Sequence, residues 1–418
     1  MIACDVSFPL ILAVIGSLFV AFNNGANDVA NAFAAAVGAK ALKLKHALFI
    51  AAILNFFGAI FLGSNVSRAL IGGIVNVRHF TDANAYIAGM LASMVAAGSF
   101  ICISTRTGLP VSSTHAIVGG IMGVAAVIGG VDAINWKFFV TLTLSWIFTP
   151  FLSALCSLCA IKLIRMAIYR GASEKIMERA CNWIPIFASA VSMASMAIVA
   201  IGIGTWREYI RRCGISLLLL IPALYIVFRW ITRKLAIKFS GREFGIEHVF
   251  RRFQAGTSAL VGFAIGSNDV ANSITPVIAI YFATKVGVIS GAFADFQIPI
   301  WLLAIGGLGM STGVLSLGHK VIGTMGRSIA LLTNSRGFSV DFSTAMTIIL
   351  ASVFGIPISS THAATGAIIG VGLENGIGGL NVRMILRIFL TWLVTVPLSA
   401  AFAIFVYFIL RMFMLLAI

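Results

Sequence analysis

The chain has 418 residues, of which 60% are hydrophobic and only 10% are charged, and its formal net charge is +16. Soluble domains carry roughly 25% charged residues, so this composition excludes an ordinary soluble enzyme and predicts an all-α polytopic membrane protein. The basic residues cluster between the apolar runs, as cytoplasmic loops of membrane proteins do, so we expect no nucleic acid partner.

Apolar runs longer than the ~18 residues of a spanning helix recur along the whole chain. They predict about twelve transmembrane segments with short loops and no soluble domain. The first run follows a terminus without basic residues, so we interpret it as a membrane helix and not as a cleaved signal peptide. The predicted segments are 7–38, 46–63, 83–103, 108–130, 136–161, 183–203, 213–228, 253–283, 286–310, 341–355, 357–374 and 384–415.

Two polar motifs each occur twice. GANDVANA at Gly25–Ala32 returns 241 residues later as GSNDVANS at Gly266–Ser273, and PVSSTHA at Pro110–Ala116 returns 247 residues later as PISSTHA at Pro357–Ala363. Unrelated motifs repeated in one order at nearly one spacing indicate an internal duplication. We therefore expect an N-terminal repeat at 1–161, linking helices with basic cytoplasmic loops at 162–252, and a C-terminal repeat at 253–418.

The Lys and Arg residues predict the orientation. With the N-terminus outside, 21 of them fall on the inner side and 8 on the outer side, which is the bias of cytoplasmic faces. Segments one to five then recur as eight to twelve in inverted topology. Inverted repeats with polar motifs on broken or re-entrant helices near the midplane are typical of secondary transporters. If the Ser-Ser-Thr segments re-enter the membrane without crossing it, the segment count changes but the inversion can remain.

The first motif places Asn27, Asp28 and Asn31 at membrane depth, where polar groups are costly and usually functional. The two asparagines share one helix face, and Gly25 permits either a helix break or the close approach of another backbone. Carboxylate and carbonyl oxygens suit a cation such as Na⁺, whereas amides can donate to an anion. Asn268, Asp269 and Asn272 repeat this geometry. The alternative interpretation is a polar contact between packed helices.

The second motif predicts the start of a helix, because proline suits the first turn. Such an end favours an anion through its dipole and its free N–H groups, and the Ser-Ser-Thr hydroxyls add donors. Two such ends from inverted halves could enclose one tetrahedral oxyanion without any Lys or Arg in either motif. Ordinary helix caps are the alternative. His115 and His362 are equally consistent with structural hydrogen bonding and with ligand binding.

The two carboxylates indicate ion coupling. An anion ~4 Å from one carboxylate is repelled by ~4 kcal/mol at an effective dielectric constant of about 20. Asp28 and Asp269 therefore oppose anion binding unless Na⁺ or a proton neutralises them. Anion affinity then depends on the cation, which is the thermodynamic basis of symport. We expect no cofactor other than this coupling Na⁺ or H⁺.

These motifs resemble those of the inorganic phosphate transporter (PiT) family, as do Gln297–Leu303 and the Gly306–Gly326 stretch. The resemblance covers nearly the whole chain. It implies a symporter of inorganic phosphate, not an enzyme, with inverted repeats in a multi-pass chain of the cell (inner) membrane, and a homodimer in the lipid bilayer. Many relatives have a glutamate in the second segment, where this chain reads Leu-Asn-Phe-Phe at 54–57.

The resemblance also implies residue roles, motif by motif. Phosphate binding falls to Asn27, Ser112, Ser113, Thr114, Asn268, Ser359, Ser360 and Thr361. Coupling-cation binding falls to Asp28, Asn31, Asp269 and Asn272, with Asp28 and Asp269 as metal ligands if the ion is Na⁺.

Other functions remain as alternatives. The closest is a symporter of sulfate or another tetrahedral oxyanion, since some members of the superfamily carry sulfate. A primary pump is disfavoured because the chain has no G-x-x-x-x-G-K-[ST] loop. An enzyme acting on a phosphorylated lipid is disfavoured because catalysis usually gives unlike roles to the residues of a site. A channel would not need two inverted copies.

Overall fold

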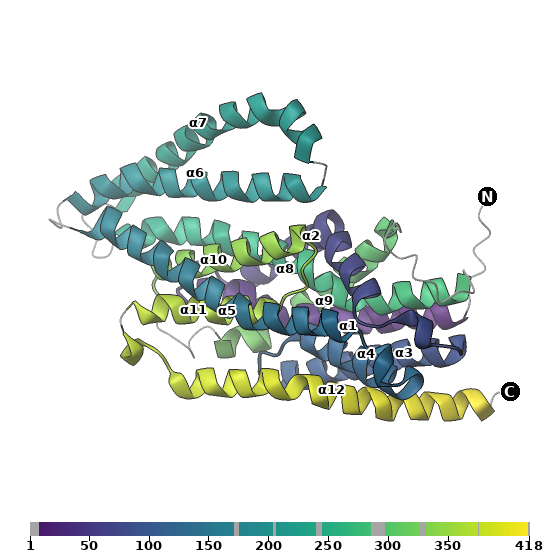
Figure 1. The fold of residues 1–418 in the computed structure, drawn as a ribbon. Coiled ribbons are helices and arrows are strands. Elements are labelled where there is room, and N and C mark those ends of the chain that lie inside the picture. The colour runs from purple at the N-terminus through teal and green to yellow at the C-terminus, as the bar shows by residue number, and fades with distance from the viewer. Residues whose placement is uncertain are drawn as a thin grey trace.

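The structure, a computed structural model, describes residues 8–170, 175–203, 206–239, 245–285, 297–325, 332–374 and 376–416. Within these ranges the chain folds into twelve α-helices, seven of which are long and apolar enough to cross a membrane (Figure 1). The predicted all-α polytopic fold is therefore confirmed. The helices are α1 (Phe8–Gly38), α2 (Leu44–Gly73), α3 (Ala83–Arg106), α4 (Ser113–Gly129), α5 (Trp136–Ile164), α6 (Ile176–Ile203), α7 (Trp206–Phe239), α8 (Gly245–Lys285), α9 (Ile300–Met325), α10 (Asn334–Val353), α11 (Ser360–Leu373) and α12 (Val382–Leu416).

Helices α3 and α4 form a hairpin that enters and leaves the helical body at one end. Asn76, before α3, donates its backbone N–H to Ala133 O, after α4, at 2.8 Å. Asn135 N likewise donates to Ile74 O at 3.1 Å. Helix α4 has 17 residues, which extend about 26 Å at ~1.5 Å per residue. That length is at the lower end of what spans a hydrocarbon core of ~30 Å. The predicted segment 108–130 does not cross, because the tip of this hairpin ends inside the helical body, where Leu109 O and Val111 N bond to Asn27 of α1.

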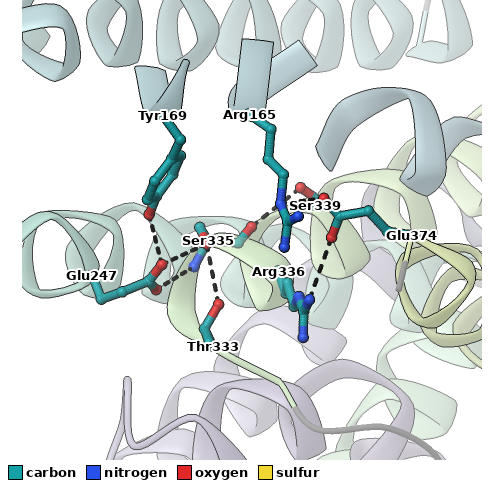
Figure 2. Close-up of polar contacts among 8 residues, drawn as sticks. All are labelled: Arg165, Tyr169, Glu247, Thr333, Ser335, Arg336, Ser339 and Glu374. Atoms are coloured by element: carbon teal, nitrogen blue, oxygen red, sulfur yellow. Dashed lines mark hydrogen bonds and ion pairs between the residues drawn. The ribbon is translucent and has the colours of Figure 1, made fainter. Parts of the chain in front are cut away.

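Helices α10 and α11 form a second hairpin of the same kind. Arg336, in the first turn of α10, contacts Glu374, directly after α11, at 3.5 Å. Arg165, directly after α5, pairs with the same carboxylate (Figure 2). Helix α11 has only 14 residues, so the predicted segment 357–374 does not cross either. Figure 2 also shows Glu247, in the first turn of α8, which accepts from Ser335 N at 2.9 Å.

The two hairpins enter from opposite faces. Helix α5 begins at the base of the first hairpin and ends at the base of the second, and its 29 residues are enough to span a membrane. The hairpin tips meet between these faces. Thr114 Oγ1 donates to Ile358 O at 3.2 Å, and Thr361 Oγ1 donates to Val111 O at 3.0 Å. We name the face that carries the α1–α2 connection the inner face, after the charge bias.

The first helix of each half packs along the second helix of the other half. On α1, a Cβ at Gly25 would collide with the backbone carbonyl of Met310 on α9. On α8, a Cβ at Gly266 would collide with the carbonyl of Asn55 on α2. Both α1 and α8 run without interruption through their motifs. Of the two alternatives predicted for Gly25, the helix break is wrong and the close approach of another backbone is confirmed.

Other predicted boundaries also differ from the structure. Helix α9 starts at Ile300 and continues to Met325, whereas the predicted segment was 286–310, of which 286–296 lie outside the described residues. Helix α2 extends ten residues beyond the predicted end at 63, and Val66, Leu70 and Ile71 of this extension are buried. Arg106, counted with the inner loops, ends α3 at the hairpin tip. The linking helices α6 and α7 lie together at one side of the body (Figure 1).

Candidate functional site

The twelve polar residues of the four motifs gather where the hairpin tips meet α1 and α8, and each is at most 5% exposed. They are Asn27, Asp28, Asn31, Ser112, Ser113, Thr114, Asn268, Asp269, Asn272, Ser359, Ser360 and Thr361. Residues from four separate sequence stretches therefore form one buried polar cluster that is closed to both faces. Among the described residues, no Lys or Arg side chain hydrogen-bonds to any of them.

Asn27 and Asn268 each hold the hairpin tip of their own half. Asn27 Nδ2 donates to Thr105 Oγ1 at 3.1 Å and to Leu109 O at 3.2 Å. Its Oδ1 accepts from Val111 N at 3.2 Å. In the second half, Asn268 Nδ2 donates to Ser352 Oγ at 3.3 Å. Both amides are engaged with protein, so an anion would contact them only by exchange with these partners.

Asn31 and Asn272 reach across to the hairpin of the other half. Asn31 Nδ2 lies 3.3 Å from Ser360 Oγ and 3.0 Å from Thr361 Oγ1. Asn272 Nδ2 lies 3.2 Å from both Ser113 Oγ and Thr114 Oγ1. Each hairpin tip is therefore held by one asparagine of each half, and the two halves close over the same small volume.

The two carboxylates lie beside the hairpin hydroxyls but have different surroundings. Asp28 accepts from Asn31 Nδ2 at 3.1 Å and from Ser113 Oγ at 2.9 Å. Asp269 accepts from Ser360 Oγ at 2.7 Å. Asp269 Oδ1 and Asn31 Oδ1 are buried and have no hydrogen-bond partner in the described part of the chain. Unpartnered buried oxygens call for an explanation, and oxygen ligands of this kind fit a hard cation.

The second motif lies at the start of the second helix of each hairpin, α4 or α11, but its proline precedes that helix. Ser112 and Ser359 are the caps: Ser112 Oγ accepts from His115 N at 3.2 Å, and Ser359 Oγ accepts from His362 N at 3.3 Å. The prediction that Pro110 occupies the first helical turn is wrong, because capping by Ser112 sets the start at Ser113. The uncapped N–H groups of these two first turns can still donate to an anion.

The two histidines point away from the cluster toward α5 and α12. His362 Nδ1 lies 3.1 Å from Trp146 O, and His115 Nδ1 lies 3.2 Å from Trp392 O. A carbonyl can only accept, so each Nδ1 carries a proton. Pro150 lacks the N–H that would bond Trp146 O within α5, and His362 supplies the missing donor. This geometry accounts for the histidines as structural hydrogen-bonders.

Sequence reasoning missed a third buried carboxylate. Asp341 on α10 is 1% exposed, and its Oδ2 accepts from Ser258 Oγ at 2.5 Å. The corresponding position in the first half, at the hairpin spacing of 247, holds Met94. The predicted segment began at 341, which placed this aspartate at a membrane boundary. A lone acid inside an apolar, repeated segment was the available signal.

Comparison with known proteins identifies the family. The model of the phosphate transporter family matches residues 24–403. The chain belongs to this family. Its members with similar sequences include a candidate phosphate permease of Pyrococcus abyssi, 38% identical over 395 residues that cover 93% of this chain and 95% of the relative. The chloroplastic inorganic phosphate transporter 2-1 of Arabidopsis thaliana is 33% identical over 92% of this chain and 69% of its own length.

A solved structure of similar fold, described as the sodium-dependent phosphate transporter, is 38% identical in sequence to this chain. It matches with a TM-score of 0.86 and covers 97% of this chain and 100% of its own. The resemblance inferred from the motifs is thus confirmed at the level of the family and the fold.

Proposed function

We propose that this protein is a secondary active symporter that moves inorganic phosphate together with Na⁺ across the cell (inner) membrane by alternating access. The phosphate transporter family supports the substrate, and the sodium-dependent structural relative supports Na⁺ over H⁺. The sulfate alternative has no such support. The two halves act as inverted repeats in this proposal, and the functional unit is a homodimer.

One observation carries the proposal: two oppositely directed hairpin tips and two buried carboxylates share a single closed volume. Asn31 and Asn272 connect each half to the tip of the other, so neither half completes the site alone. In our proposal the Ser-Ser-Thr turns and Asn27 and Asn268 bind phosphate. The cation lies against Asp28 and Asp269 with oxygens such as Asn31 Oδ1.

The charges of this cluster explain why a cation is needed. Phosphate and the two carboxylates repel one another in a low-dielectric volume, and no Lys or Arg among the described residues bonds to the cluster to offset that repulsion. Each Na⁺ placed beside a carboxylate removes about one unit of negative charge. Phosphate affinity then rises with Na⁺ concentration, and the reciprocal effect on Na⁺ affinity has the same size.

The test is uptake of radiolabelled phosphate into proteoliposomes that contain the purified protein, with Na⁺ and pH gradients imposed separately. We expect accumulation with an inward Na⁺ gradient at symmetric pH. Accumulation driven only by a pH gradient would replace Na⁺ by H⁺ in the proposal. Absence of phosphate uptake under both gradients, with sulfate uptake under either, would contradict the phosphate assignment.

A further inference from the structure

The two hairpin tips have the same backbone turn but different side chains. Gly108 and Gly355 adopt φ values of 71° and 67°, and the amides before them bond back in the same way: Thr107 N donates to Ile103 O at 3.0 Å, and Phe354 N donates to Leu350 O at 3.2 Å. At the hairpin spacing of 247 residues, Arg106 on the first tip corresponds to Val353 on the second. Only the first tip carries a positive charge.

Arg106 lies near the middle of the membrane and next to the site. It follows Thr105, whose Oγ1 accepts from Asn27 Nδ2 at 3.1 Å, and Asn27 precedes the inner end of α1 by about 16 Å at ~1.5 Å per residue. The Arg106 side chain is exposed, and no described carboxylate pairs with it. A charged guanidinium at this depth is costly unless it faces a water-filled cavity or a partner. Because the first hairpin enters from the outer face, its tip points toward the inner face.

The second tip has its positive charge on a neighbouring helix. A Cβ on Gly355 would lie 3.0 Å from Asn65 O and 4.0 Å from Ala69 Cβ, so the tip rests on the turn of α2 that contains Arg68. Arg68 is exposed, and within the described ranges its guanidinium hydrogen-bonds to neutral groups of its own helix, Ser64 O and Asn65 Oδ1, both at 3.4 Å.

Arg68 also borders a cavity of about 590 Å³ at the outer base of the first hairpin. Two arginines, Arg68 and Arg78, and one carboxylate, Asp132, line this cavity, together with the polar side chains of Asn76 and Asn135. The outer approach to the second tip therefore has a net positive lining. The second hairpin enters from the inner face, so its tip points toward this outer approach.

We propose that Arg106 and Arg68 are the anion-holding residues of the inner and the outer approach, one for each tip. Each guanidinium draws inorganic phosphate to its tip from its own face and supplies the charge that the Ser-Ser-Thr turns lack. This inference rests on the proposed function. It assigns the two residues to opposite faces, so each determines the apparent phosphate affinity on one side of the membrane only.

The size of the effect follows from electrostatics. A unit charge about 10 Å from a phosphate at an effective dielectric constant between 20 and 40 changes affinity by about fourfold to fifteenfold, and salt reduces this at exposed sites within a Debye length of ~10 Å. We therefore expect removal of one guanidinium charge to raise one KM for phosphate by about three- to tenfold at low salt.

The experiment uses the full chain in proteoliposomes of defined orientation. KM for radiolabelled phosphate is measured for transport starting at the outer face and for transport starting at the inner face. Arg106→Gln should raise the inner KM and leave the outer KM unchanged, and Arg68→Gln should do the opposite. Arg106→Lys and Arg68→Lys should restore most of the affinity. Lys162→Gln at the inner end of α5 and Lys137→Gln at its outer end remove the same charge from exposed positions and should change neither KM.

Equal changes of both KM values, no change in either, or the reversed pattern would each overturn the inference, provided that the variants still exchange phosphate for phosphate. The Arg→Lys variants keep the test decisive if a Gln variant fails to fold, because loss of sidedness in a folded lysine variant also overturns it. A wild-type protein that transports no phosphate would overturn the proposed function instead.

Discussion

Replacing Asp28 by asparagine removes one charge from the cluster and keeps its shape. In the structure the Asp28 carboxylate accepts from Asn31 Nδ2 and from Ser113 Oγ. An asparagine can still accept from Ser113 but presents an NH₂ group where Asn31 also donates. One hydrogen bond is lost, which costs about 1 kcal/mol. That is small beside the stability of a folded protein, so Asp28→Asn should fold and insert normally.

The effect on coupling should be much larger. A unit negative charge ~4 Å from the anion opposes binding by ~4 kcal/mol at an effective dielectric constant of about 20, or about a thousandfold in affinity. In the proposed mechanism wild-type protein binds phosphate tightly only when a cation offsets this repulsion, whereas Asp28→Asn removes the repulsion itself. We expect concentrative uptake to disappear and phosphate–phosphate exchange to persist with a weaker Na⁺ dependence.

The assay compares gradient-driven accumulation with exchange in the same proteoliposomes. Glu178→Gln, a change of the same charge at an exposed position, is the control and should keep both activities. Wild-type accumulation by both Asp28→Asn and Asp269→Asn would refute the account of coupling and make the two carboxylates structural.

Three further predictions concern helix packing, the Trp146 carbonyl inside α5 and the hairpin base, and thermal unfolding of the purified protein checks all of them. Gly25→Ala should destabilise the protein by about 1–3 kcal/mol, because its Cβ meets the Met310 carbonyl; Gly256→Ala, with no atom within 4 Å of the added Cβ, should not. His362→Ala leaves Trp146 O without a donor and should cost about 1–3 kcal/mol, whereas the exposed His319→Ala should be neutral. Glu374→Gln leaves Arg165 and Arg336 facing each other without a shared carboxylate. We expect the free energy of unfolding to fall by about 1–2 kcal/mol, a modest loss because Arg165 is half exposed. The exposed Glu178→Gln is the control. An unchanged unfolding temperature in any of the three would contradict the contact on which that prediction depends.

Much of the fold could be predicted from the sequence because membrane helices have a distinctive, strongly apolar composition. The apolar runs and the repeated motifs predicted helices at nearly every position where the structure has one. The hairpins could not be predicted in the same way. A helix pair that turns back at mid-depth has the same apolar composition as two crossings. The contacts of Thr114 with Ile358 O and of Thr361 with Val111 O distinguish the two, because tips that come from opposite faces can meet only between those faces.

The site could be predicted as a set of residues but not as a set of contacts. Pattern and spacing selected the twelve polar residues that the structure brings together. They could not indicate that Asn31 contacts the hairpin of the other half while Asn27 holds its own. That assignment depends on the three-dimensional approach of the halves, which is set by the crossings at Gly25 and Gly266. Local pattern carries no information about which partner occupies such a crossing.

The two copies of the first motif have the same Asn-Asp-Val-Ala-Asn sequence, but their two carboxylates have different hydrogen bonds. Both oxygens of Asp28 accept hydrogen bonds, whereas Oδ1 of Asp269 has no partner in the described part of the chain. The difference arises because Asn31 donates to Asp28, while Asn272 donates to Ser113 and Thr114. An oxygen without a donor is the better cation ligand, since no hydrogen bond has to be broken before binding. If Na⁺ is the coupling ion, it should therefore contact Asp269 first. Asp269→Asn should then raise the Na⁺ concentration for half-maximal phosphate exchange more than Asp28→Asn does. Equal shifts for the two variants would show that the two carboxylates contribute equally to Na⁺ binding and would contradict this reasoning.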